Sequence, residues 1–205
     1  MSELGLFPLG IVLLPNEQIP LHIFEDRYQE LIGECLDEER EFGLVFADED
    51  GLREIGTRAA VTDVLEKFDD GRLNIVAEGR ERFRLLELTQ GRSFQTALVE
   101  ELADDDPDGA DPADTEKALN LFHQLVELTG AIVEEPRLDV AQLSFELAGR
   151  FELAPELKQR LLQLTSEASR MKLLAELLAG AAAAVERERE IAERAQANGK
   201  VDPRA

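Results

Sequence analysis

The amino-acid sequence predicts an α+β protein with a β-rich first half and a helical second half. Up to about Leu102, short apolar segments alternate with turn residues, which is typical of closely spaced strands. An acidic stretch containing proline and glycine follows at 104–109, and beyond it apolar residues recur only at helical spacing. We therefore predict a β-rich lobe over residues 1–103, an acidic linker over 104–111, a helical bundle over 112–197 and a disordered tail over 198–205.

The first strands flank a turn that contains proline. The apolar run from Leu4 to Pro15 lacks the basic region and the cleavage site of a signal peptide, so a strand is expected there. Strands predicted at 10–14 and 18–23 flank Pro15-Asn16-Glu17, whose residues suit a turn. Pro8 and Pro20 each remove a backbone donor, so they should lie at strand edges or bulges.

A single helix and five further strands complete the predicted lobe. Residues 25–39 have helical spacing, with an apolar face made of Tyr28, Leu31, Ile32, Cys35 and Leu36. Strands are predicted at 42–46, 57–68, 73–77, 83–88 and 94–102, and Asp69-Asp70-Gly71 is a hairpin turn. Six or seven short strands around one helix predict a closed or nearly closed mixed sheet.

Local signals divide the second half into four helices. Asp111 is expected to cap the first helix with Pro112 at its first position, and Pro136 is expected to end it. Asp139 and Gln142 resemble a capping box for the second helix. Pro155 opens the third helix, and a long final helix runs from about 166 to 195. Its alanine-rich apolar face is interpreted as bundle core, with an oligomer contact as the alternative.

The charge balance limits the classes of partner. The 205 residues carry a formal net charge of -22, which would repel nucleic acid and acidic membranes, so neither is an expected partner. No apolar stretch approaches the ~20 residues of a membrane-spanning helix. Cys35 is the only cysteine, which excludes an internal disulfide and is compatible with a reducing compartment. We expect a soluble, cytoplasmic protein.

The motifs that carry chemistry are absent or incomplete. The chain has neither a GxxxxGK[ST] phosphate loop nor a GxSxG nucleophile turn. Its two histidines, His22 and His123, do not make a zinc cluster. The stretch beginning at Asp104 starts like a calcium loop, but Thr115 stands where a bidentate glutamate is required. We predict no catalytic residue, metal or cofactor, and interpret the acidic stretch as a solvated linker.

Several short motifs occur in a characteristic order. They are Phe7-Pro8-Leu9, Pro15, Pro20, Phe24-Glu25-x-Arg27-Tyr28, Phe42-Gly43-Leu44-Val45, Asp70-Gly71-Arg72-Leu73, Gly79-x-x-Arg82-Phe83-Arg84 and Lys158-Gln159-Arg160-Leu161-Leu162. Together they resemble the N-terminal substrate-binding domain of Lon-type ATP-dependent proteases over about residues 5 to 180. One departure is Asn16, where that family usually has glycine, although asparagine also tolerates left-handed backbone.

The resemblance implies both a fold and a function. That family's domain has a PUA-like pseudo-barrel lobe followed by a helical bundle, helps to recognise substrate proteins and carries no catalysis. The ATPase and peptidase domains of the protease have no counterpart here, so the resemblance implies a stand-alone module. It would bind peptides or partly unfolded proteins, with a separate protease or chaperone as a candidate partner. The alternatives are a small hydrolase with an unrecognised site and a structural oligomer built through the last helix.

The residues that carry the resemblance are expected to be structural. Phe24, Tyr28 and Phe83 should seat the helix on the sheet, and Arg27 and Arg82 should form charge-assisted contacts that hold the two together. Glu25 should lie at the helix start, where the helix dipole favours it. The full predicted set is Phe7, Pro8, Leu9, Pro15, Pro20, Phe24, Glu25, Arg27, Tyr28, Gly43, Gly71, Gly79, Arg82 and Phe83. The binding surface itself is expected in an apolar groove on the sheet or between the lobes.

Overall fold

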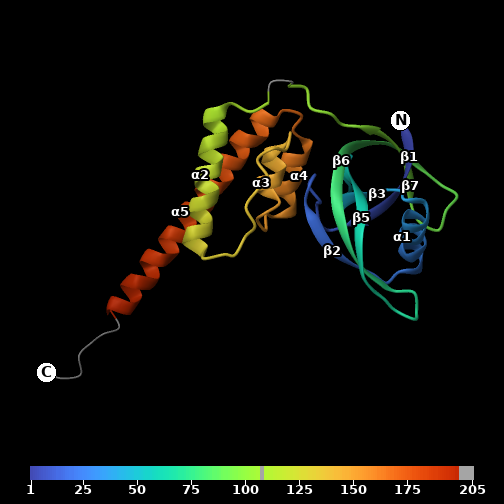
Figure 1. The fold of residues 1–205 in the computed structure, drawn as a ribbon, viewed down its shortest axis with the longest axis horizontal. Coiled ribbons are helices and arrows are strands. Elements are labelled where there is room, and N and C mark those ends of the chain that lie inside the picture. Colours follow the sequence, from blue (N-terminus) through green and yellow to red (C-terminus); the bar gives the residue numbers. More distant parts are fainter. Residues whose placement is uncertain (107–108, 199–205) are drawn as a thin grey trace.

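A β-rich lobe with one helix is joined to a lobe of four helices (Figure 1). The computed structural model describes residues 1–106 and 109–198. The α+β class is therefore confirmed. The predicted disordered tail lies outside the described residues except for Asn198, and so does part of the predicted linker.

The strands of the first lobe close into a ring. They are β1 (Ser2–Leu9), β2 (Gln18–Ile23), β3 (Phe42–Asp48), β4 (Gly51–Leu52), β5 (Ile55–Lys67), β6 (Leu73–Thr89) and β7 (Thr96–Glu101). The sheet order β1-β7-β6-β5-β3 returns to β1, because β1 also pairs with β3 in parallel. This ring-like pseudo-barrel confirms the predicted closed sheet. The remaining long strand, β2, pairs with the first half of β6.

The chain between β1 and β2 differs from the prediction. Residues 10–14 form no strand; the strand lies earlier, in β1. Val12 and Leu14 are buried against the helical lobe instead, so this segment packs with side chains rather than pairing with a neighbouring strand. The turn that follows holds Asn16 at φ 66°, which confirms that asparagine accepts left-handed backbone there.

Two strands predicted separately form one continuous strand. The segments 73–77 and 83–88 are the two halves of the continuous strand β6, which follows a hairpin turn with Gly71 at φ 90°.

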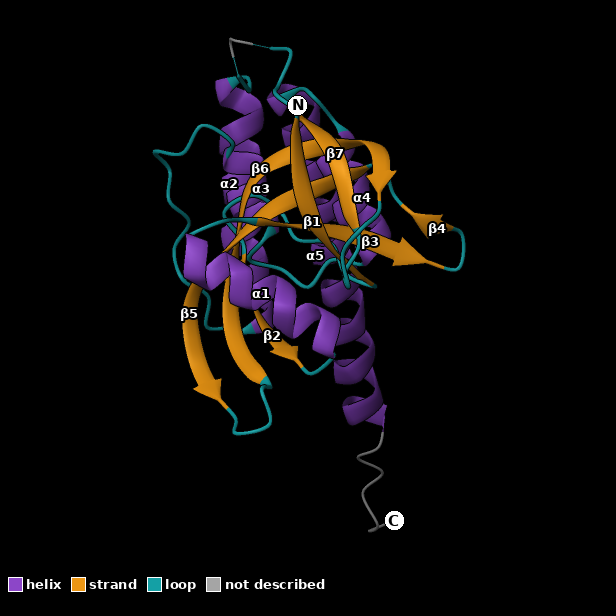
Figure 2. Cartoon of the chain, turned by 90° about the vertical axis from the view of Figure 1, so that its right-hand side faces the viewer, coloured by secondary structure: helices purple, strands orange, loops and turns teal. Residues whose placement is uncertain are grey.

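Helix α1 (Asp26–Glu38) lies where its apolar spacing predicts it. It follows Glu25, which occupies the cap position, and it buries Tyr28 and three other apolar residues. It covers the side of the ring that faces away from the helical lobe (Figures 1 and 2).

The helical lobe contains α2 (Pro112–Thr129), α3 (Leu143–Ala148), α4 (Pro155–Gln163) and α5 (Glu167–Asn198). Asp111 caps α2 as predicted, accepting a hydrogen bond of 2.8 Å from the backbone nitrogen of Ala113. The predicted end at Pro136 is wrong, because Gly130 adopts φ 67° and stops the helix there. Ile132 lies beyond this end and is fully exposed.

The predicted capping box before α3 is also wrong. The cap position belongs to Gln142, and its side chain makes no cap hydrogen bond. It donates instead to the carboxylate of Asp104 at 3.0 Å. A contact between the two lobes thus replaces the local cap expected at Asp139.

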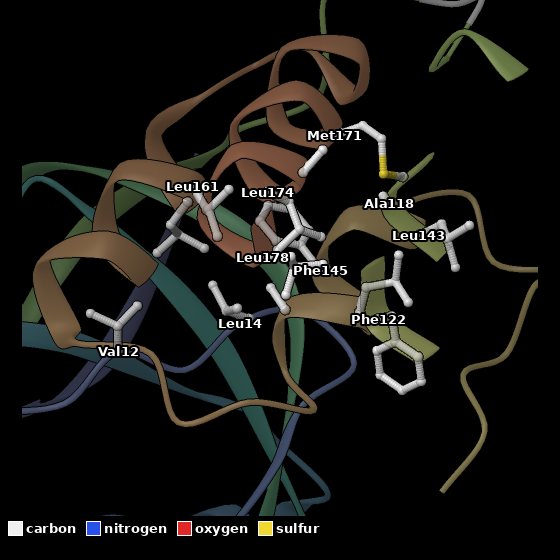
Figure 3. Packing of buried hydrophobic residues seen from close by; sticks show 14 of the residues in the cluster. Val12, Leu14, Ala118, Phe122, Leu143, Phe145, Leu161, Met171, Leu174 and Leu178 are labelled. Atoms are coloured by element: carbon white, nitrogen blue, oxygen red, sulfur yellow. The ribbon is translucent and has the colours of Figure 1, made fainter. Parts of the chain in front are cut away.

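Both lobes share the largest buried cluster. Val12 and Leu14 of the first lobe pack in the cluster that contains Phe145, Leu174 and Leu178 of the helical lobe (Figure 3). The first half of α5 supplies much of this core, and its later half extends beyond α2 (Figure 1). Because the core spans the boundary, the lobes are packed against each other rather than tethered.

Candidate functional site

The first predicted residues join the strand β1 to the helix α1. The ring centroids of Phe7 and Tyr28 lie 4.1 Å apart, and both side chains are buried. Pro8 and Leu9 continue β1 where it pairs only with β3, so Pro8 lies on a segment with one strand neighbour. Pro20 likewise lies on β2, which pairs only with β6 among the described strands. Both prolines therefore stand where a missing donor costs no ladder hydrogen bond.

The turn at Pro15 is fixed by a close backbone approach to β6. Pro15 is buried, and the neighbouring Asn16 donates its backbone N–H to the carbonyl of Gly79 at 2.9 Å. The N–H of Gly79 in turn donates to the carbonyl of Glu17 at 2.9 Å. A Cβ at position 79 would lie 2.1 Å from the carbonyl oxygen of Leu14, so only glycine fits.

Two aromatic residues lie away from the positions expected for them. Phe83 is buried in a separate cluster with Leu4, Leu6 and Val45, beside Gly43, and does not contribute to the cluster that seats α1. Phe24 is 61% exposed and does not anchor the helix either. It follows the fully buried Ile23, so the alternation of the strand directs it outward.

The two signature arginines also play different roles from the expected one. Arg27 is half-exposed, pairs with Glu25 at 2.7 Å and lies 4.5 Å from the centroid of the Tyr28 ring. Arg82 does not hold α1 at all. It points into the boundary with the helical lobe, and its side chain is only 1% exposed.

A buried polar network therefore joins the lobes around Arg82. Its guanidinium donates to the carbonyl oxygens of Leu162 at 2.8 Å and Leu164 at 2.6 Å, and it also pairs with Asp104. Arg170, fully buried on α5, donates to Asp104 at 2.7 Å and pairs with Glu167 at 2.7 Å. Two carboxylates thus balance two buried guanidiniums, and Asp104 is the member of the network that remains partly exposed, at 16%.

The network affects the pKa values of its members. Burial alone would raise the pKa of the Asp104 carboxyl, but hydrogen bonds from Arg170 and Gln142 and the charges of both arginines hold it below its usual value. Burial lowers the pKa of Arg82, and the nearby charge of Arg170 lowers it further. The network therefore acts as an electrostatic lock between the lobes.

The start of the predicted linker belongs to this boundary, so its interpretation as a solvated stretch is wrong for Asp104 and Asp106. The carboxylate of Asp106 accepts hydrogen bonds from the Ser166 hydroxyl at 2.7 Å and from the backbone nitrogens of Glu167 and Ala168. It thereby caps the start of α5. Both carboxylates are occupied by protein donors, which argues against the calcium loop.

A polar cleft of about 350 Å³ lies between the lobes. Its walls come from the start of β2 and from Glu78 on one side, and from the 134–137 segment and α3 on the other. Glu146 is a buried acid of this cleft: its side chain is 1% exposed and accepts hydrogen bonds from Arg137 and Arg150. The groove between the lobes is therefore lined by internally paired charges, and is not the apolar groove expected.

An aromatic patch lies at the far end of β2, with His22 and Phe24 exposed and Phe68 half-buried. It consists of His22, Phe24 and Phe68: the His22 ring stacks on Phe24 at 5.9 Å and meets Phe68 edge-on at 6.2 Å between centroids. The guanidinium of Arg72 lies 5.0 Å from the Phe68 ring. The three rings come from the strand β2, the connection to α1 and the β5–β6 hairpin, so sequence spacing could not bring them together.

The aromatic patch places apolar area on the surface of the β-rich lobe. Two further exposed apolar residues, Val64 and Leu65, lie on the same hairpin a few residues before Phe68. Large apolar groups that gather on a surface commonly mark a contact with another polypeptide. The sequence contained one signal for this site, namely Phe24 following the buried end of a strand.

The groups considered for catalysis do not converge. His22 contacts Asn74, and His123 contacts Glu135; in the described ranges neither forms a hydrogen bond with a serine or cysteine. Ser144 is fully buried beside Glu167 and Arg170. Burial raises the pKa of the Cys35 thiol to about 11. Among the described residues, the hydrolase alternative thus has neither a serine–histidine nor a cysteine–histidine pair.

Residues 1–106 and 109–198 contain no cluster of three or more His, Cys, Asp or Glu side chains that could hold a metal ion. No helix in these ranges is both long enough and apolar enough to cross a membrane.

Comparison with protein families gives a match over most of the chain. The family described as the ATP-dependent protease La (LON) substrate-binding domain matches residues 3–180. Among solved structures, the Lon N-terminal domain protein from Xanthomonas campestris is 28% identical, with a TM-score of 0.67 over 87% of this chain and 98% of that chain. The N-terminal domain of Mycobacterium avium complex Lon protease, at 15% identity and a TM-score of 0.65, supports the fold alone.

Full-length relatives are much longer than this chain. Lon protease from Paraburkholderia phytofirmans is 26% identical over 94% of this chain, and that from Anaeromyxobacter dehalogenans is 29% identical over 86%. The aligned regions cover only 26% and 23% of those proteases. The likeness therefore concerns one domain of these relatives.

Proposed function

Because the chain belongs to the family of ATP-dependent protease La (LON) substrate-binding domains, we propose that it binds exposed apolar segments of partly unfolded polypeptides. The binding surface in this proposal is the aromatic patch of His22, Phe24 and Phe68. The observation that carries it is the 61% exposure of Phe24 within a stacked cluster of rings. Burying one such ring would contribute about 1.5–3 kcal/mol to binding.

The proposal includes no catalytic step. The bound polypeptide would be passed to a separate protease or chaperone, with this chain acting as an adaptor. A neutral or basic polypeptide is favoured by the net charge of -22, which also disfavours nucleic acid as a ligand. We propose the cytoplasm as the location of this activity.

The test compares two exposed apolar residues on different lobes. Reduced and carbamidomethylated lysozyme serves as a basic unfolded probe, and native lysozyme serves as the control for charge alone. We expect the unfolded form to bind and the native form not to bind at 0.15 M salt, where exposed charges are screened over about 8 Å. Phe24→Ser should weaken binding about tenfold, equivalent to about 1.4 kcal/mol.

Ile132→Ser is the matched control, because Ile132 is fully exposed but lies in the helical lobe. It removes a similar apolar area from the surface and should leave the affinity within twofold. Equal losses in both variants would mean that surface apolarity in general, and not the patch, causes binding. Failure of the wild-type chain to bind any unfolded probe would refute the proposal itself.

A further inference from the structure

The free edge of β2 lies next to the aromatic patch. β2 pairs with β6 along Gln18 to Ile23, and no other described strand pairs with it. Its sequence, QIPLHI, carries no formal charge at neutral pH, although 32% of the chain is charged. Exposed edges are commonly protected by charged side chains. Here Pro20 and the short length of the strand serve that purpose, and Gln18 at the start of β2 lies in the wall of the interlobe cleft.

The position of Pro20 shows which backbone N–H and C=O groups of β2 point away from β6. Proline has no N–H, so it can pair opposite Val76 only where its nitrogen points away from β6. In an antiparallel pair this direction alternates along the strand. The backbone groups of Gln18 and His22 therefore also point away from β6, giving two free N–H donors and three free carbonyls at this edge.

The side chains at the edge leave part of the core open. Ile19 and Leu21 are only partly buried, and they pack at the margin of the cluster that contains Phe7, Ile75 and Ala77. On the opposite face Gln18, Pro20 and His22 are exposed. An additional strand would cover Ile19 and Leu21 on one face and reach the aromatic patch with its end.

We propose that polypeptides bind this chain by adding an extended strand to the free edge of β2. The proposal rests on the proposed function and specifies its binding mode. The occupant is an extended segment of another protein that alternates apolar residues with neutral or basic ones. Main-chain hydrogen bonds at Gln18, Pro20 and His22 would give affinity for any sequence, as is typical of strand addition.

Charge decides between this occupant and a second copy of the chain. Glu78 and Glu66 lie beside the outer face of β2, where they contact Gln18 and Asn74. Two copies that meet edge to edge would bring together chains of net charge -22 each. A basic segment is attracted to the same surface.

The experiment separates backbone from side-chain contributions at one position. The probe is a fluorescent eight-residue peptide that alternates valine or isoleucine with lysine or threonine, titrated against the full chain. His22→Ala removes the ring and keeps the N–H, whereas His22→Pro removes both and leaves the pairing with β6 unchanged. We expect His22→Pro to bind about tenfold more weakly than His22→Ala, since a backbone hydrogen bond and the room for a neighbouring strand are both lost.

A second measurement uses the unaltered protein, so it does not depend on the folding of a variant. The same peptide, N-methylated at alternate residues, should lose at least tenfold in one methylation register and little in the other. Equal binding of His22→Pro and His22→Ala, together with equal binding of all peptides, would overturn strand addition while leaving the proposed function intact. A wild-type chain that binds neither this peptide nor unfolded lysozyme would overturn both. Sedimentation showing a dimer that His22→Pro dissociates would assign the edge to a second copy and overturn the proposal.

Discussion

Replacing Arg82 by methionine should disrupt the lock between the lobes. The substitution keeps an unbranched side chain of similar length and removes the guanidinium that reaches Leu162, Leu164 and Asp104. Asp104 retains Arg170 and Gln142 as partners, so the main loss is at the two carbonyl oxygens.

The magnitude follows from these contacts. Each carbonyl loses a charged donor that contributes about 1.5–3 kcal/mol. Part of that loss is offset, because a buried charge and its repulsion with Arg170 are removed as well. The net loss should be about 3–4 kcal/mol, near the range of about 3–5 kcal/mol for breaking a buried pair. At about 2–4 °C per kcal/mol for a chain of this size, the melting temperature should fall by roughly 10 °C.

Calorimetry and hydrogen exchange measure the effect. The transition of Arg82→Met should move to lower temperature and broaden or split as the lobes become less coupled, and amide exchange should rise around Leu164 and Asp105. Arg84→Met is the control, because Arg84 lies on the same strand but is 46% exposed. Its only charged contact among the described residues is a loose one, with Nε 3.9 Å from the Glu100 carboxylate. A surface pair of that kind contributes about 0–1 kcal/mol. If the two variants melt within 2 °C of each other, the reasoning about the lock is wrong.

Three further results are expected. Gly79→Ala should destabilise the protein by about 3 kcal/mol in urea titration, because its Cβ would displace the carbonyl of Leu14. An unchanged urea midpoint would contradict the close approach of Leu14 to position 79. Asp104 and Glu146 have pKa values held below their usual ones, so the free energy of unfolding should be constant near neutral pH and decline as the pH falls below about 4. Glu146→Gln should flatten that decline when melting temperatures are measured in acid. Cys35, with a pKa of about 11 and 5% exposure, should react with iodoacetamide at pH 8 only as fast as the protein opens, which mass spectrometry in rising urea would reveal.

Local sequence rules predicted an element well where the conformational preference of neighbouring residues determines it. The hairpin at Gly71, the cap at Asp111 with Pro112, and the left-handed turn at Asn16 each depend on the conformational preference of one or two residues. Helix α1 was predicted within a residue at each end, because its apolar spacing is regular. The same rules were wrong about the end of α2, where Gly130 stopped a helix whose apolar spacing continued to Val133.

The candidate site was less predictable because its parts are far apart in the chain. The aromatic patch joins residues from β2, the connection to α1 and the β5–β6 hairpin, and no spacing rule relates them. The interlobe cleft was expected to be apolar, whereas its carboxylates are satisfied by arginines from other segments. Charge-assisted contacts were predicted for Arg82, but the structure places them at Leu162, Leu164 and Asp104 rather than at α1.

The sequence by itself determined the α+β class, the division into a β-rich first half and a helical second half, the closed sheet and the family resemblance, since these depend on periodicity, turn chemistry and motif order. Only the tertiary structure decided that Arg82 holds the helical lobe rather than α1, that Phe24 faces solvent, and that β2 has a free edge. Each of these depends on which segments meet in space, and that is set by packing of the whole core rather than by any local preference.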